Sequence, residues 1–230
     1  MSPALPQKGK WLTALSVYTR PRVVGMVFLG FAAGLPFLLV FTTLSAWLTE
    51  ASVSRSTIGF FSWVGITYSI KVFWAPVIDR LPFPLLTRVF GKRRGWMLAA
   101  QVTIACGLAG MALTDPGSHL TQLALFALLV AFGSATQDIT IDAWRIEAVE
   151  QDLQGAMAAT YVLGYRLALL TAGAGALHLA EMTNWSLTYI IMAGLMTIGM
   201  LTTLSIPEPS HPENRRTREL ESRLESSIGI

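Results

Sequence analysis

Charged side chains inside long apolar runs are the residues of this sequence best placed to carry chemistry. Asp138, Asp142 and Arg145 stand at positions i, i+4 and i+7, which places them on one face of a helix. Lys71 and Arg166 are isolated charges in two other apolar runs. A charge at bilayer depth costs roughly 2.5 to 3.5 kcal/mol, so it normally faces a partner or a wet cavity. The pattern predicts either a cavity in which a carboxylate takes up and releases a proton, or a fixed network of ion pairs.

Lys71 and Asp138 are expected at the same depth. Each stands seven residues before a predicted inner-face marker, Ile78 and Arg145 respectively, or about 10 Å along a helix. This depth allows the two side chains to pair, and the alternative is that Lys71 snorkels to the membrane surface. A fixed network would join Asp138 to Lys71 and Asp142 to Arg145.

Arg166 lies near the middle of its apolar run, where its side chain cannot easily reach the surface. It is expected to face a cavity, either to hold a carboxylate of an anionic substrate or to neutralise Asp138. Gln137 and Thr136 add neutral hydrogen-bonding groups beside that aspartate.

Enzyme chemistry is the alternative class. Asp138 and Asp142 form a D-x-x-x-D pattern, which membrane prenyltransferases use to hold Mg²⁺ and a diphosphate. Such enzymes need a second acidic motif, and no other apolar run in the sequence has one. Arg145 would also weaken metal affinity. The sequence predicts no catalytic residue, no metal and no cofactor beyond a proton gradient.

The composition indicates a polytopic membrane protein. The 230 residues are 53% hydrophobic and 13% charged, about half the charge of an ordinary soluble domain. The net charge of +3 does not predict nucleic-acid binding, because the basic residues stand in short clusters between apolar runs. The single cysteine, Cys106, excludes a disulfide framework.

Six runs approach or exceed the ~20 residues that a helix needs to cross a bilayer. They are Val23–Thr49, Ser56–Ile78, Gly95–Thr114, Leu120–Gln137, Leu153–Ala180 and Met182–Ile206. We expect an all-α protein with an N-terminal segment over residues 1–20, a six-helix transmembrane bundle over 21–206 and a charged tail over 207–230.

The loop charges predict the orientation. With both ends on one side, fourteen Lys and Arg residues lie on that side and only Arg55 on the other. The positive-inside rule then puts both termini in the cytoplasm.

Small residues in the first and fifth runs predict close helix packing, with or without sliding. They are Gly25, Gly30, Gly34, Gly164, Gly173 and Gly175. Pro36 is expected to kink or loosen the first helix.

The loop after the second run carries an acidic-basic pair followed by a glycine and a basic cluster. This resembles the loop signature of the major facilitator superfamily, although Ala75 replaces an expected glycine and Leu81 to Phe90 form an insertion. The matching residues are Asp79, Arg80, Gly91, Lys92, Arg93 and Arg94.

Longer strings resemble one branch, the anhydromuropeptide permeases of the AmpG family. They are Gly30 to Pro36, Leu44 to Leu48, Gly59 to Arg80, Phe90 to Trp96 and Ser134 to Arg145. The resemblance implies proton-driven import of N-acetylglucosaminyl-anhydro-muramyl peptides across the bacterial inner membrane, with roles in cell-wall recycling and beta-lactamase induction. The branch is also similar to acetyl-CoA transporters, so another organic anion is the alternative substrate.

By the same resemblance, two motifs lie nearest the expected cavity. The implied roles are Asp138 or Asp142 as proton carrier, Lys71 as its modulator, and Gln137 and Arg166 as contacts to the sugar-peptide. The predicted substrate-binding residues are Gly34, Ala135, Gln137 and Arg166, and the charge network comprises Lys71, Asp138, Asp142 and Arg145.

Transporters of that superfamily have twelve spans in two six-helix halves. Six spans predict the N-terminal half, with a missing C-terminal half as partner beside membrane lipid and a sugar-peptide. A truncated product is the favoured interpretation, and a homodimer of halves is the alternative.

Overall fold

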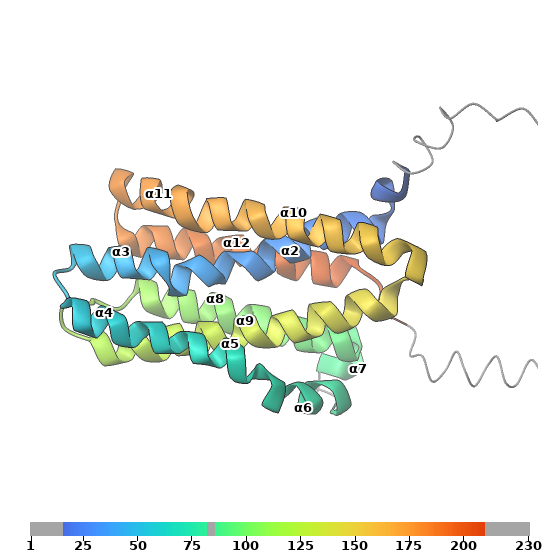
Figure 1. Ribbon diagram of the computed structural model, residues 1–230, viewed down its shortest axis with the longest axis horizontal. Coiled ribbons are helices and arrows are strands. Elements are labelled where there is room, and N and C mark those ends of the chain that lie inside the picture. Colours follow the sequence, from blue (N-terminus) through green and yellow to red (C-terminus); the bar gives the residue numbers. More distant parts are fainter. Residues whose placement is uncertain (1–15, 82–85, 210–230) are drawn as a thin grey trace, which may run out of the picture.

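The computed structural model describes residues 16–81 and 86–209. The predicted tail beyond residue 209 and most of the predicted N-terminal segment fall outside these ranges. The regular elements of the described residues are all helical, as predicted. The longer helices run side by side along the long axis of the molecule (Figure 1).

The first predicted span forms a short 3₁₀ turn, η1 (Val17–Thr19), and then two helices, α2 (Pro21–Val40) and α3 (Thr42–Glu50). Pro21 starts α2, where its missing N–H is not needed. Pro36 lies inside α2, yet the chain stays helical for another turn. The break comes at Phe41, whose φ of −115° and ψ of −96° leave the helical region.

The second predicted span is a chain of short helices rather than one long helix. It consists of α4 (Arg55–Phe61), η2 (Ser62–Gly65), α5 (Ile66–Ile70), η3 (Lys71–Phe73) and α6 (Ala75–Arg80). Pro76 contributes to the interruption, because it cannot donate a backbone hydrogen bond to the preceding turn. These pieces follow one path beside α9 (Figure 1).

Within the described residues, five helices are long and apolar enough to cross a membrane. They are Pro21–Glu50, Lys92–Ala112, Leu120–Ala148, Gln151–Met182 and Trp185–Ser205. The interrupted second segment is not among them, so the count of six stays a prediction.

The rest of the bundle begins with α7 (Leu86–Phe90), α8 (Lys92–Ala112) and α9 (Leu120–Ala148). After η4 (Gln151–Leu153) and α10 (Gln154–Leu170), a π-helical turn, η5 (Thr171–Gly175), leads into α11 (Ala176–Met182) and α12 (Trp185–Ser205). The fourth apolar run ends at Gln137, and α9 continues as one helix to Ala148, past the charged residues predicted to share a helical face. The charged residues from Asp138 onward therefore stand on a continuous, rigid element.

Glycines bring α2 and α10 into backbone contact. A Cβ atom on Gly164 would lie 1.8 Å from the carbonyl oxygen of Val27, and one on Gly30 would lie 2.2 Å from that of Tyr161. Neither distance can accommodate a side chain, so these positions require glycine. Gly34 lies in the same contact, against the carbonyl oxygen of Tyr165.

The other predicted glycines have different surroundings. Gly25 faces the side chains of Thr202 and Ile206, and Gly173 faces Leu38. Gly175 meets only the backbone of its own helical stretch.

Candidate functional site

The structure brings Lys71 and Asp138 together across two elements. Lys71 begins η3, in the broken segment, and Asp138 lies on α9. The distance from Lys71 Nζ to Asp138 Oδ2 is 3.7 Å, and the two side chains are 36% and 21% exposed. The ion-paired alternative is thus present in this conformation, and Lys71 does not have to extend to the surface for a partner.

Two neighbouring side chains of α9 have unsatisfied polar atoms. Gln137 is fully buried, and neither its amide nitrogen nor its amide oxygen has a hydrogen-bond partner among the described residues. The Oδ1 atom of Asp138 is likewise buried without a partner there. An unsatisfied buried polar group costs about 1–3 kcal/mol, so these atoms favour a ligand that can bond to them.

Trp74 anchors the broken segment to α9 next to these groups. Its indole Nε1 donates a hydrogen bond of 3.2 Å to the hydroxyl of Thr136, and its ring packs against that of Phe132. The contact holds the chain just after Lys71 against the helix that carries Asp138, and so helps to set the position of the ion pair.

Asp142 and Arg145 form a second ion pair on α9. The distance from an Arg145 guanidinium nitrogen to Asp142 Oδ1 is 3.3 Å. The Asp142 side chain is about half exposed. The four residues predicted as a charge network therefore occupy one region, as two pairs that share α9.

Three tyrosines, which the sequence analysis did not single out, surround this charge network. Tyr68 on α5, and Tyr161 and Tyr165 on α10, all lie within electrostatic range of Asp138. The rings of Tyr161 and Tyr165 pack with centroids 6.1 Å apart. In the sequence, the i, i+4 spacing of Tyr161 and Tyr165 next to Arg166 is the signal that could have identified these two tyrosines.

Arg166 lines an open cavity of about 750 Å³ on α10, together with Tyr161, Tyr165 and apolar side chains. Its side chain is exposed, and no ion pair or hydrogen bond joins it to any other described residue. The geometry thus leaves its guanidinium available for a ligand and does not pair it with Asp138.

Gly34 and Ala135 are buried in this conformation. A Cβ on Gly34 would lie 2.7 Å from the Tyr165 carbonyl oxygen, so this glycine is required by helix packing. A direct role for either residue in substrate binding stays a prediction.

The loop motif forms a network at one end of the bundle. Arg93 bonds to Asp79 Oδ1 at 2.8 Å and to Glu147 Oε1 at 2.6 Å. Lys92 donates to the carbonyl oxygen of Asp79. Arg80 is exposed and has no ion-pair partner among the described residues. The network ties α6, α8 and α9 together, and Glu147 was not predicted.

Glu208, just after α12, completes this network. Its Oε1 and Oε2 accept hydrogen bonds from the backbone N–H groups of Arg93 and Arg94, at 2.7 and 3.1 Å. The Arg94 side chain donates back to the carbonyl oxygens of Thr203 and Leu204. Gly91 permits the approach, since its φ is +90° and a Cβ there would lie 2.5 Å from Glu208. The carboxylate satisfies free N–H groups at the start of α8.

Comparison with known proteins identifies the family. The model of the Major Facilitator Superfamily matches residues 26–228. The chain is 42% identical over 197 residues to the anhydromuropeptide permease of Escherichia coli K12, covering 85% of this chain and 39% of that protein. It is 36% identical over 189 residues to AmpG 4 of Rickettsia felis, covering 81% and 45%, and 32% identical over 202 residues to AmpG 3 of Rickettsia typhi, covering 87% and 48%. It thus spans less than half the length of these relatives. With the loop network and the apolar helices, these matches show that the chain belongs to the Major Facilitator Superfamily and is AmpG-like.

Proposed function

We propose that this chain is the N-terminal half of a proton-coupled importer of peptidoglycan-derived anhydromuropeptides. The similarity to the Escherichia coli permease supports the substrate class. The observation that carries the proposal is the Lys71–Asp138 pair beside the unsatisfied amide of Gln137. A stable structural core rarely leaves such groups without partners, whereas a binding site needs them.

The proton step acts through Asp138. Its ionised carboxylate holds Lys71 across the contact between η3 and α9. Protonation removes the negative charge, so the broken segment and α9 lose their electrostatic attraction and can separate. A change in protonation would in this way favour one arrangement of the helices over another. Asp142 is the second candidate carrier, because it is more exposed and already paired with Arg145.

The substrate is recognised by Arg166 and the tyrosines of α10. An unpaired guanidinium suits a peptide or lactyl carboxylate, which it can bind through two parallel hydrogen bonds. Tyr161 and Tyr165 supply aromatic faces and hydroxyls beside it, which suit the apolar face and hydroxyls of a sugar ring. Gln137 would contribute its buried, unsatisfied amide on α9.

The network of Asp79, Arg93 and Glu147 acts in this proposal as a latch for one conformation. It joins three helices through one buried arginine, so opening that end of the bundle requires its ion pairs to break. Membership of the superfamily supports a second six-helix half as the partner that closes the cavity. The inner membrane, with both termini in the cytoplasm, is the proposed location.

The alternatives are an acetyl-CoA-type or other organic-anion transporter of the same superfamily, and a D-x-x-x-D prenyltransferase. In the described ranges no group of three or more His, Cys, Asp or Glu side chains could hold a metal ion. The ion pair between Asp142 and Arg145 also engages one carboxylate of the D-x-x-x-D pattern. That ion pair favours transport over metal-dependent prenyl transfer.

Uptake into energised vesicles tests the proposal. The chain is co-expressed with the C-terminal half of the Escherichia coli permease, and uptake of a radiolabelled anhydromuropeptide is measured with and without a proton gradient. We expect gradient-dependent uptake that Asp138→Asn with Asp142→Asn abolishes and that Arg55→Gln, at the opposite end from the loop network, leaves unchanged. Undiminished gradient-driven uptake by the double variant would refute the proton role. Uptake of acetyl-CoA but not of muropeptide would favour the alternative substrate.

A further inference from the structure

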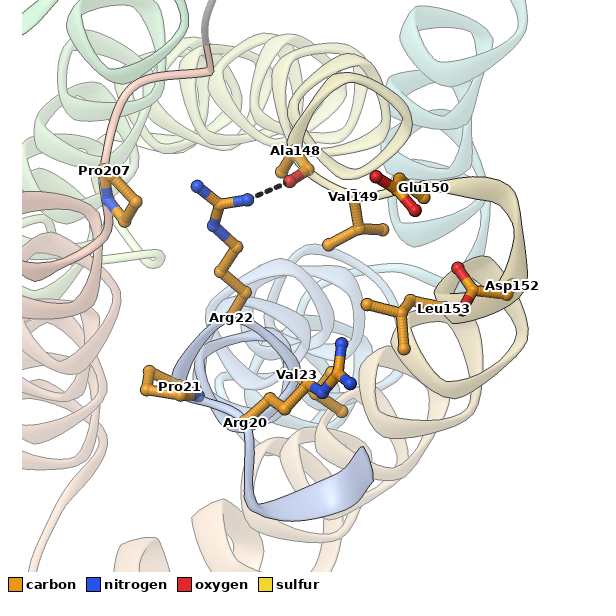
Figure 2. A pocket seen from close by; sticks show the side chains of 10 residues that line it. All are labelled: Arg20, Pro21, Arg22, Val23, Ala148, Val149, Glu150, Asp152, Leu153 and Pro207. Carbon is orange, nitrogen blue, oxygen red and sulfur yellow. Dashed lines mark hydrogen bonds between the residues drawn. The ribbon is translucent and has the colours of Figure 1, made fainter. Parts of the chain in front are cut away.

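A hollow lined by charges of both signs lies at the end of the bundle where α2 begins. Its volume is about 490 Å³, and Figure 2 shows how its lining comes from the start of α2, the loop between α9 and α10, and Pro207. Arg20 and Arg22 supply two positive charges, and Glu150 and Asp152 supply two negative charges. All four residues are exposed.

These opposite charges are not paired with one another. No ion pair found among the described residues joins either arginine to either acid. Arg22 uses one guanidinium nitrogen to donate to the carbonyl oxygen of Ala148, at the end of α9, which fixes its direction (Figure 2). Its other donors, and the whole Arg20 guanidinium, stay available. The hollow therefore offers separated positive and negative walls to a single ligand.

A second, apolar groove continues from this hollow along the outside of the bundle. Its volume is about 610 Å³, and it shares Pro21, Arg22 and Pro207 with the charged hollow. It runs between α2 and α12, past Phe28 and Leu201, which are 45% and 63% exposed. From Pro21 to Phe28 the groove follows two turns of α2, about 10 Å into the predicted membrane region. A groove of this kind fits an acyl chain.

We propose that these two connected hollows form a binding site for a zwitterionic, amine-bearing phospholipid of the phosphatidylethanolamine type. Arg20 and Arg22 bind the phosphate diester, Glu150 and Asp152 bind the primary ammonium, and one acyl chain lies in the groove between α2 and α12. The charge pattern selects this headgroup: an anionic glycerol headgroup would satisfy the arginines but leave two carboxylates facing it. The bound lipid would tie the start of α2 to the α9–α10 loop and to the end of α12.

Native mass spectrometry of the delipidated 230-residue chain tests the site. The protein is mixed with equal amounts of phosphatidylethanolamine and phosphatidylglycerol that carry identical acyl chains. We expect a preference for phosphatidylethanolamine. Arg20→Gln is expected to reduce binding of both lipids about tenfold or more, because each charge-assisted hydrogen bond contributes about 1.5 kcal/mol or more.

Two further variants separate headgroup recognition from the groove. Glu150→Gln with Asp152→Asn should remove the preference for phosphatidylethanolamine while binding of phosphatidylglycerol is kept or improved. Ser205→Phe, which fills the groove, should weaken both lipids. Arg55→Gln and Glu181→Gln, exposed charges away from the site, are the matched controls and should change nothing.

Equal binding of the two lipids to the wild-type chain would overturn the proposal. The same conclusion would follow if the acidic double variant kept the preference, or if glycerophosphoethanolamine without acyl chains competed as well as the intact lipid. Because all of the substituted side chains are exposed, thermal melting of each variant should match the wild type in lipid-free detergent. The assay does not use transport, so its result is independent of the proposed function.

Discussion

Replacing Gly164 by alanine should force α2 and α10 apart. The added Cβ would lie 1.8 Å from the Val27 carbonyl oxygen, whereas ordinary contact begins at 3.4 Å, so the helices must separate locally by up to about 1.6 Å. Overpacking of this kind typically costs 1–3 kcal/mol. For a chain of this length, that cost corresponds to a fall in Tm of roughly 2–12 °C. Thermal unfolding in detergent, followed by tryptophan fluorescence, measures it.

Gly155 and Gly194 provide matched controls for this prediction. Both lie in helices, α10 and α12, and a Cβ on either would meet nothing within 4 Å. Their replacement by alanine should raise the free energy of unfolding by about 0.4–1 kcal/mol, because the unfolded chain loses freedom. If Gly164→Ala melts at the same temperature as these controls, the inference that α2 and α10 cross in backbone contact at Gly164 is refuted.

Three other predictions concern the polar groups. Gln137→Leu should raise the free energy of unfolding by about 1–2 kcal/mol, because it removes an unsatisfied buried amide, and it should abolish uptake. A lower melting temperature for this variant would contradict the unsatisfied state of the amide. Lys71→Met should lower the free energy of unfolding by about 1–3 kcal/mol because it leaves Asp138 without its cation, and adding Asp138→Leu should recover most of that loss. Additive losses in the double-variant cycle would show that the pair is not coupled. Glu208→Gln should lower the free energy of unfolding by about 0.5–2 kcal/mol through the weakened cap of α8, and a Tm equal to that of the wild type would exclude the cap.

The sequence predicted the helical class and most of the spans from hydropathy alone. The structure adds detail where hydropathy and backbone geometry differ. The fourth apolar run ends at Gln137 because a charge follows, and α9 continues to Ala148, so Asp138, Asp142 and Arg145 lie on one helix as their spacing predicted. The second span was predicted as one run, yet 3₁₀ turns interrupt it at Ser62–Gly65 and Lys71–Phe73.

The candidate site was predictable in part. Equal depth suggested Lys71 and Asp138 as partners, because helix rise converts sequence distance into depth. The roles of Glu147 and Glu208, which reach Arg93 from 54 and 115 residues away, were not predicted. Contacts of that kind depend on which helix ends meet.

The sequence by itself determined that this chain is helical and enters a membrane, because apolar length and the positions of charges follow directly from residue types. It also determined which charges stand within or beside the apolar runs. Only the tertiary structure decided which of those charges have partners: Asp138 is paired, while Arg166 is exposed beside two tyrosines and has no ion-pair partner among the described residues. The reason is that pairing depends on the rotation and separation of helices. Close contacts such as that between Gly164 and Val27 set both, and they join residues far apart in the chain.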